Sequence, residues 1–161
     1  MGYELDAFLG KTESLLAWKN TLPSAVVADV VADVGLVPLT SELYHDLAVF
    51  VDRQGMAPEE SGRTGSFLDL GYVDGPGWPM GPIAAWGRAA SVGTTIAFIT
   101  ARYFGDDGDE SVTLWTDGKA SRVQAHQALE ALGVVVPKGM DITSREGILN
   151  MNTRGWVSKA R

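Results

Sequence analysis

The chain has 161 residues, of which 45% are hydrophobic and 20% are charged, and it carries a net charge of −7 and no cysteine. This composition is typical of a globular chain with one core, and it excludes a disordered protein, a disulfide scaffold and a cysteine-based zinc site. Because an acidic surface repels phosphate, we expect no nucleic-acid partner.

The chain lacks the sequence features of membrane insertion and of export. Its longest apolar stretch, 25–37, is interrupted by Asp29, Asp33 and Gly35 and is far shorter than a membrane span. The N-terminus has acidic residues where a secretory signal needs a basic segment. We therefore expect a soluble, cytoplasmic protein with no membrane partner, and solubility alone is one explanation of its acidity.

The first third of the chain predicts three strands and two helices. Apolar and polar residues alternate over 3–9, which predicts a strand with one face in the core. Apolar residues at helical spacing, preceded by Thr or Ser caps, predict helices at 12–20 and 41–53. Between them, the runs 25–31 and 35–39 predict two strands joined by a tight turn, with a helix through the first run as the alternative.

Periodicity stops between about 54 and 81, where Gly, Pro, Ser and Glu dominate. A loop of this length is uncommon inside a compact domain and is often a binding element. Tyr72 and Trp78 are the aromatic residues that we expect to anchor a partner there. The alternative is a surface excursion that these aromatic side chains pin to the core.

The clearest pattern in the chain is a β-hairpin at about 94–116. Two runs of β-branched and aromatic residues flank a Gly-Asp-Asp-Gly-Asp connection, and such runs fit a pleated, half-buried surface. A helix that begins at Pro82 and ends near Ala90 precedes the hairpin. This hairpin is predicted to organise the sheet.

The C-terminal part predicts a strand at 120–123, a helix at 124–132 and an edge strand at 134–136, followed by short helical pieces after Asp141. With the earlier elements, these predict a single α+β domain over 1–161. Its sheet is expected to be largely antiparallel, with the hairpin at its centre and three or four helices covering it.

The chain offers little for catalysis. Its two histidines, His45 and His126, lie in predicted helices without a local nucleophile, and no zinc-protease, P-loop or nucleophile-elbow motif occurs. We therefore predict no catalytic residue, no cofactor and no metal site. The alternative is a small enzyme with its site at the 54–81 loop and one of these histidines as a general base.

Four acidic residues at the hairpin tip are the candidate contact for a partner: Asp106, Asp107, Asp109 and Glu110. Their carboxylates are suited to receive an Arg or Lys side chain, in agreement with the net charge. A bound calcium or magnesium ion is an alternative, although the spacing is not that of an EF-hand. A solvated acidic turn with no ligand is the other alternative.

Five short segments occur in an order that is familiar from a known family: LVPLT at 36–40, YFG at 103–105, ESVTLW at 110–115, DG at 117–118 and ALEALGV at 128–134. Together they resemble a family of small bacterial proteins of the immunity type, associated with polymorphic toxin systems. The resemblance covers about half of the chain. The chain departs from the family pattern at Asp106-Asp107, where glycine is more usual, and in the tail after Asp141.

The resemblance implies a non-enzymatic protein that neutralises a cognate bacterial toxin. Joined to the acidity, it predicts a protein–protein interaction with a basic toxin domain through the four acidic residues of the hairpin tip, with Tyr72 and Trp78 adding apolar contact. A subunit of a larger assembly is the remaining alternative. The sequence does not set the oligomeric state.

Overall fold

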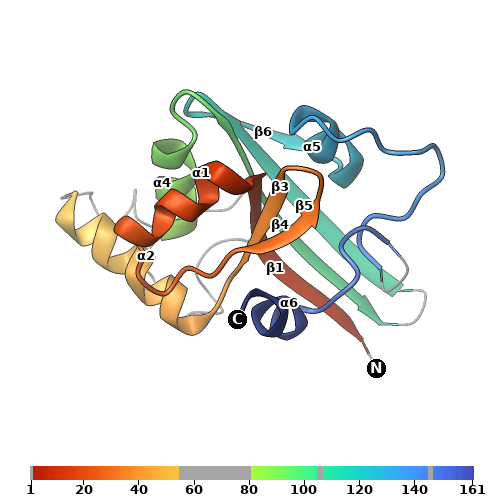
Figure 1. Ribbon diagram of the computed structural model, residues 1–161, viewed down its shortest axis with the longest axis horizontal. Helices are drawn as coiled ribbons and strands as arrows, with labels where there is room; N and C mark the ends of the chain where they lie inside the picture. The colour runs from red at the N-terminus through yellow and green to blue at the C-terminus, as the bar shows by residue number, and fades with distance from the viewer. Residues whose placement is uncertain (1, 55–80, 105–106, 145–146) are drawn as a thin grey trace.

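The structure is a computed structural model, and it describes residues 2–54, 81–104, 107–144 and 147–161 (Figure 1). Most of the predicted 54–81 loop, with Tyr72 and Trp78, lies outside the described residues, and so does Asp106.

Six strands form one antiparallel sheet in the order β2-β3-β1-β4-β5-β6. Their bounds are Tyr3–Lys11 (β1), Ala28–Val31 (β2), Val34–Pro38 (β3), Thr95–Phe104 (β4), Asp107–Thr116 (β5) and Lys119–Val123 (β6). The predicted hairpin is confirmed: β4 pairs with β5 from Thr95 opposite Thr116 to Phe104 opposite Asp107. The predicted strand at 25–31 begins only at Ala28, and its pairing with β3 has a register shift between Asp29 and Val31.

The helices lie on both faces of the sheet, so the protein has three layers (Figure 1). Their bounds are Thr12–Leu16 (α1), Ser41–Arg53 (α2), Gly81–Ala90 (α4), Ala125–Ala131 (α5) and Thr153–Ala160 (α6), and a 3-10 helix, η1, spans Ala17–Asn20. Helix α2 begins where the Thr40 side chain accepts a hydrogen bond from Leu43 N at 3.0 Å. The α+β prediction is confirmed.

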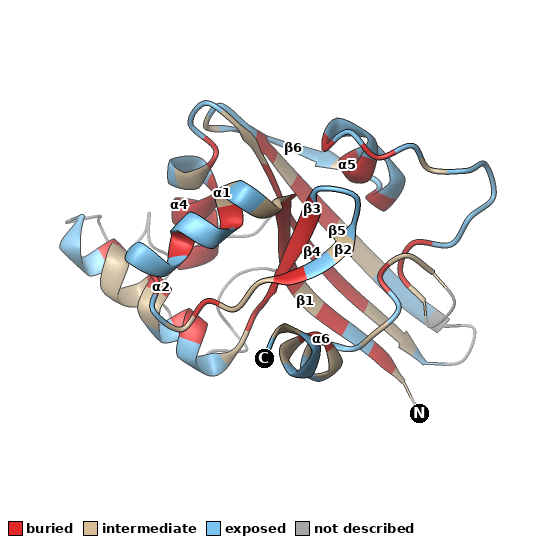
Figure 2. Cartoon of the chain, in the orientation of Figure 1, coloured by how far each residue is buried: buried red, intermediate tan, exposed pale blue. Residues whose placement is uncertain are grey.

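The sheet has a core on each face because its strands alternate. On one face Phe8, Phe98 and Trp115 pack against α1, η1, α2 and α4. On the other face Leu5 and Ile99 pack against α5 and α6. Figure 2 shows buried residues along the central strands and on the inward sides of the helices.

The predicted edge strand at 134–136 is wrong. Gly133 ends α5 with a φ of +90°, a conformation that favours glycine, and Val134 N then donates back to Leu129 O at 2.9 Å. This cap buries Val134 and leaves Val135 90% exposed, so the segment turns away from the sheet instead of joining it.

Candidate functional site

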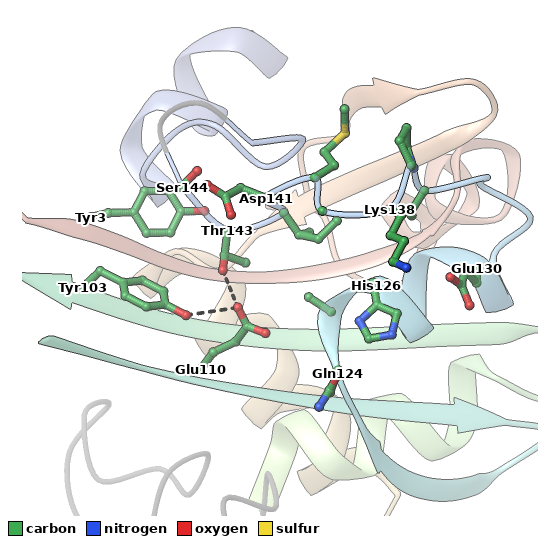
Figure 3. Close-up of a pocket in the computed structure, with 16 residues that line it drawn as sticks. Tyr3, Tyr103, Glu110, Gln124, His126, Glu130, Lys138, Asp141, Thr143 and Ser144 are labelled. Carbon is green, nitrogen blue, oxygen red and sulfur yellow. Dashed lines mark hydrogen bonds between the residues drawn. The ribbon is translucent and has the colours of Figure 1, made fainter. Parts of the chain in front are cut away.

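A groove of about 1150 Å³ lies between the sheet, helix α5 and the segment 136–144 (Figure 3). Strands β1, β4 and β5 supply its floor through Tyr3, Tyr103 and Glu110. Helix α5 and the irregular segment after it supply the walls. The groove therefore joins parts of the chain that are far apart in the sequence.

Strand pairing explains why these floor residues meet. Tyr3 lies opposite Tyr103, and Glu110 lies opposite Ala101, two residues before Tyr103 on the same face of β4. Gly108 lies opposite Tyr103, and a Cβ added there would come well inside 3.0 Å of the Tyr103 ring. The glycine thus lets the tyrosine ring lie across β5 toward Glu110.

Two hydroxyl groups hold the Glu110 carboxylate. Tyr103 Oη donates to Glu110 Oε2 at 3.3 Å, and Thr143 Oγ1 donates to the same oxygen (Figure 3). Burial raises the pKa of the Tyr103 phenol, and the nearby Glu110 charge adds to this. Tyr103 therefore stays neutral at pH 7 and remains a donor.

Tyr3 fixes the inner end of the groove. It is 5% exposed, and its Oη donates to Leu149 O at 2.6 Å. Burial, with a smaller contribution from the Glu110 charge, raises the pKa of Tyr3 well above its ordinary value. This bond ties the C-terminal segment, which carries Thr143, to the first strand.

The groove is acidic. Among the described residues that line it, three carry carboxylates, Glu110, Glu130 and Asp141, and one carries an ammonium, Lys138. Glu110 is partly buried, so its charge is less screened by water than a surface charge. The site is suited to a cationic group.

Asp109 and Glu110 are the two acidic hairpin-tip residues whose side chains the structure describes, and of these two Glu110 lines the groove. Asp109 follows the alternation of β5 and lies on the opposite face, exposed, where its Oδ1 accepts from Glu110 N at 2.9 Å. Asp107 is the first residue of β5. The tip is thus not one continuous carboxylate cluster across Asp109 and Glu110.

The two histidines are also separated. His45 is exposed on α2, which packs on the far face of the sheet, whereas His126 lines the groove at the start of α5. In the view of Figure 3, His126 and Lys138 both lie to the right of Glu110. Sequence reasoning missed Tyr3, Tyr103 and Thr143, although the alternation in β1 already placed Tyr3 on the core face.

Within the described ranges, no group of three or more His, Cys, Asp and Glu side chains is arranged to hold a metal ion. No helix in the part of the chain that the structure describes has the length and apolar character needed to cross a bilayer. Comparisons of the chain with protein-family models, curated proteins and solved structures give no match. The resemblance to immunity-type proteins therefore stays a prediction.

Proposed function

We propose that this chain is a non-enzymatic binding protein that engages a basic protein partner through the acidic groove, in the manner of an immunity protein that neutralises a toxin in the cytoplasm. The observation that carries the proposal is the groove itself: among its described lining residues, the carboxylates of Glu110, Glu130 and Asp141 outnumber the one ammonium of Lys138, and Glu110 is partly buried. The net charge of −7 supports the same reading, because it favours encounter with a cationic partner.

The rim of the groove supports a protein ligand over a small cation. Met140 lines the groove and is 47% exposed, and Val136 beside it is partly buried. Apolar side chains beside a charged floor supply the buried contact that gives a protein interface its affinity, while charge governs encounter and selection. Asp109, on the other face, would contribute only to long-range steering.

A second candidate rests on His126. An imidazole, the Glu110 carboxylate and the Tyr103 phenol line one groove, and these are groups that general acid–base catalysis uses. In a small enzyme of this kind the active site would be the groove, and the general base would be His126 instead of His45. His126→Ala separates the two candidates, because loss of a general base lowers turnover by orders of magnitude, whereas a binding protein keeps most of its affinity.

The proposed function is tested by retention of a partner from a native cell lysate at low and high salt. The tagged wild type is compared with Glu110→Gln and with a matched control, Glu42→Gln, which removes an equal charge from the exposed first turn of α2 on the far layer. We expect a basic protein, identified by mass spectrometry, that the wild type and Glu42→Gln retain at low salt and that Glu110→Gln loses. Equal retention by all three proteins would contradict the groove as the contact.

A further inference from the structure

The hydrogen bonds of Glu110 restrict which cation the groove can take. Each carboxylate oxygen has two lone pairs for accepting hydrogen bonds. Tyr103 Oη and Thr143 Oγ1 both donate to Oε2, so that oxygen is fully used. Among the described residues, no hydrogen bond reaches Oε1, and Figure 3 shows that oxygen turned away from both hydroxyls.

We infer that the groove takes the ammonium group of one lysine side chain of the partner, bound to Glu110 Oε1, in preference to an arginine guanidinium. A guanidinium binds a carboxylate best as a fork, with two parallel N–H groups directed at both oxygens. The hydroxyls of Tyr103 and Thr143 already occupy Oε2, which is one of the two carboxylate oxygens that such a fork needs. An ammonium is a compact point charge that needs only one free oxygen, so this arrangement favours lysine.

The walls of the groove suit the lysine stem. Ala125 and Ile142 line it and are 5% and 8% exposed, and Val136 adds a partly buried apolar side chain. A lysine stem buries its methylene groups along such surfaces while its charged end reaches a polar group. The volume of about 1150 Å³ exceeds that of one side chain, which leaves room for neighbouring residues of a peptide segment.

An unpartnered oxygen in the wall points independently to a missing ligand group. Ser144 lines the groove, and its Oγ is buried with no hydrogen-bond partner in the described part of the chain. Buried polar atoms are nearly always paired, so an orphan atom at a groove calls for a partner from outside the free protein. A polar group of the peptide segment that carries the lysine can supply this partner, while the ammonium itself lies at Glu110 Oε1.

This inference rests on the proposed function, and it is tested with defined peptides instead of the unidentified partner. Three blocked peptides, Ac-Ala-Lys-Ala-NH₂ and its arginine and norleucine counterparts, are titrated into the ¹⁵N-labelled full chain, and amide shifts near Glu110 and Thr143 give each Kd. n-Butylamine is the fourth ligand, and it separates a free amine from a lysine in a peptide. We expect the lysine peptide to bind about tenfold more tightly than the arginine peptide, and the norleucine peptide and n-butylamine more weakly still.

Two variants make the test specific. Glu110→Gln should weaken the lysine peptide at least about tenfold, whereas Glu42→Gln should leave it unchanged. Thr143→Val keeps the side-chain shape and frees a lone pair on Glu110 Oε2, so it should raise the affinity of the arginine peptide relative to lysine. This gain cannot arise from a loss of folding.

Several outcomes would overturn the lysine assignment. They are equal or tighter binding of the arginine peptide by the wild type, an unchanged preference in Thr143→Val, tighter binding of n-butylamine than of the lysine peptide, or the absence of saturable shifts with any ligand. Retention of a basic protein that depends on Glu110 would still support the proposed function in each of these cases. If instead the wild type, Glu42→Gln and Glu110→Gln retain the same proteins equally, the proposed function itself is contradicted.

Discussion

Removal of the Tyr3 hydroxyl should loosen the segment that forms the outer wall of the groove. Tyr3 Oη donates to Leu149 O at 2.6 Å, and both residues are buried, at 5% and 0% exposure. Tyr3→Phe keeps the ring but leaves a buried carbonyl oxygen without its donor, which costs about 1–3 kcal/mol. For a chain of this size, 1 kcal/mol corresponds to about 2–4 °C, so Tm should fall by about 2–12 °C.

The same hydroxyl should make stability fall at alkaline pH. Burial raises the pKa of Tyr3 in the folded protein above its ordinary value near 10. The native state therefore keeps this proton at a pH where the unfolded chain has lost it. The contribution to stability is complete below about pH 10 and is lost as pH rises toward the pKa of the folded state.

Urea unfolding between about pH 7 and pH 11 measures both effects. The wild type should lose free energy of unfolding above about pH 10, and Tyr3→Phe should lose less, since only the raised pKa of Tyr103 then remains in the groove. Tyr103→Phe is the control at neutral pH. It should cost less than about 1 kcal/mol, because Tyr103 is only half-buried and Glu110 keeps its bond from Thr143. Equal stability of Tyr3→Phe and wild type at pH 7 would refute the reasoning.

Three further changes probe the scaffold by urea unfolding. Gly87→Ala places a Cβ well inside 3.0 Å of the buried Trp115 ring, so it should destabilise the wild type by about 1–2 kcal/mol. In a Trp115→Leu background that contact is absent, and the same change should stabilise the protein because alanine has the higher helix propensity. A change of the same sign in both backgrounds would contradict the close contact. Thr40→Ala removes the N-cap of α2 and should cost about 1 kcal/mol, a loss that Thr40→Ser should largely avoid. Arg102→Met leaves Asp6 without its 2.8 Å partner and should cost about 2 kcal/mol at pH 7, after a discount for partial exposure of the pair. Burial already raises the pKa of Asp6, so the deficit should be small below about pH 4 and should grow as pH rises through the pKa of the folded state; a deficit independent of pH would contradict a charge effect.

Local patterns predicted most of the fold. The hairpin at 94–116 is confirmed because its two strands and its turn are neighbours in the sequence, so alternation and turn residues suffice to define it. The prediction of an edge strand at 134–136 is wrong, although its residues are β-branched. There the left-handed Gly133 and the bond from Val134 N to Leu129 O decided the path of the chain, and that cap competes with any strand.

The groove could not be read from local patterns. Thr143 lies 33 residues from Glu110, and Leu149 lies 146 residues from Tyr3, so their contacts depend on how the C-terminal segment crosses the sheet. One part was within reach of the sequence: the two-residue period of a strand already separates Asp109 from Glu110 onto opposite faces. The prediction that the four acidic residues of the tip form one contact surface did not take this alternation into account.

The first strand explains why the C-terminal segment lies where it does. Strand β1 is longer than its neighbour β3, whose pairing stops at Ala7 opposite Pro38, so the amides of Glu4 and Asp6 have no strand on that side. Asn152 Oδ1 and Thr153 Oγ1 accept from these two amides at 3.0 and 2.9 Å.

The N-cap residue of helix α6 bonds to strand β1 instead of capping its own helix. Asn152 occupies the N-cap position, yet its side chain makes no cap hydrogen bond and serves β1 instead. Side-chain oxygens of the C-terminal segment thus accept from two amides of β1 that no described strand pairs. Together with the bond from Tyr3 to Leu149, these contacts hold the end of the segment against β1, and Thr143 lies just before that point. The position of the Thr143 hydroxyl that donates to Glu110 Oε2, and with it the proposed preference for lysine, therefore depends on the unequal lengths of two neighbouring strands.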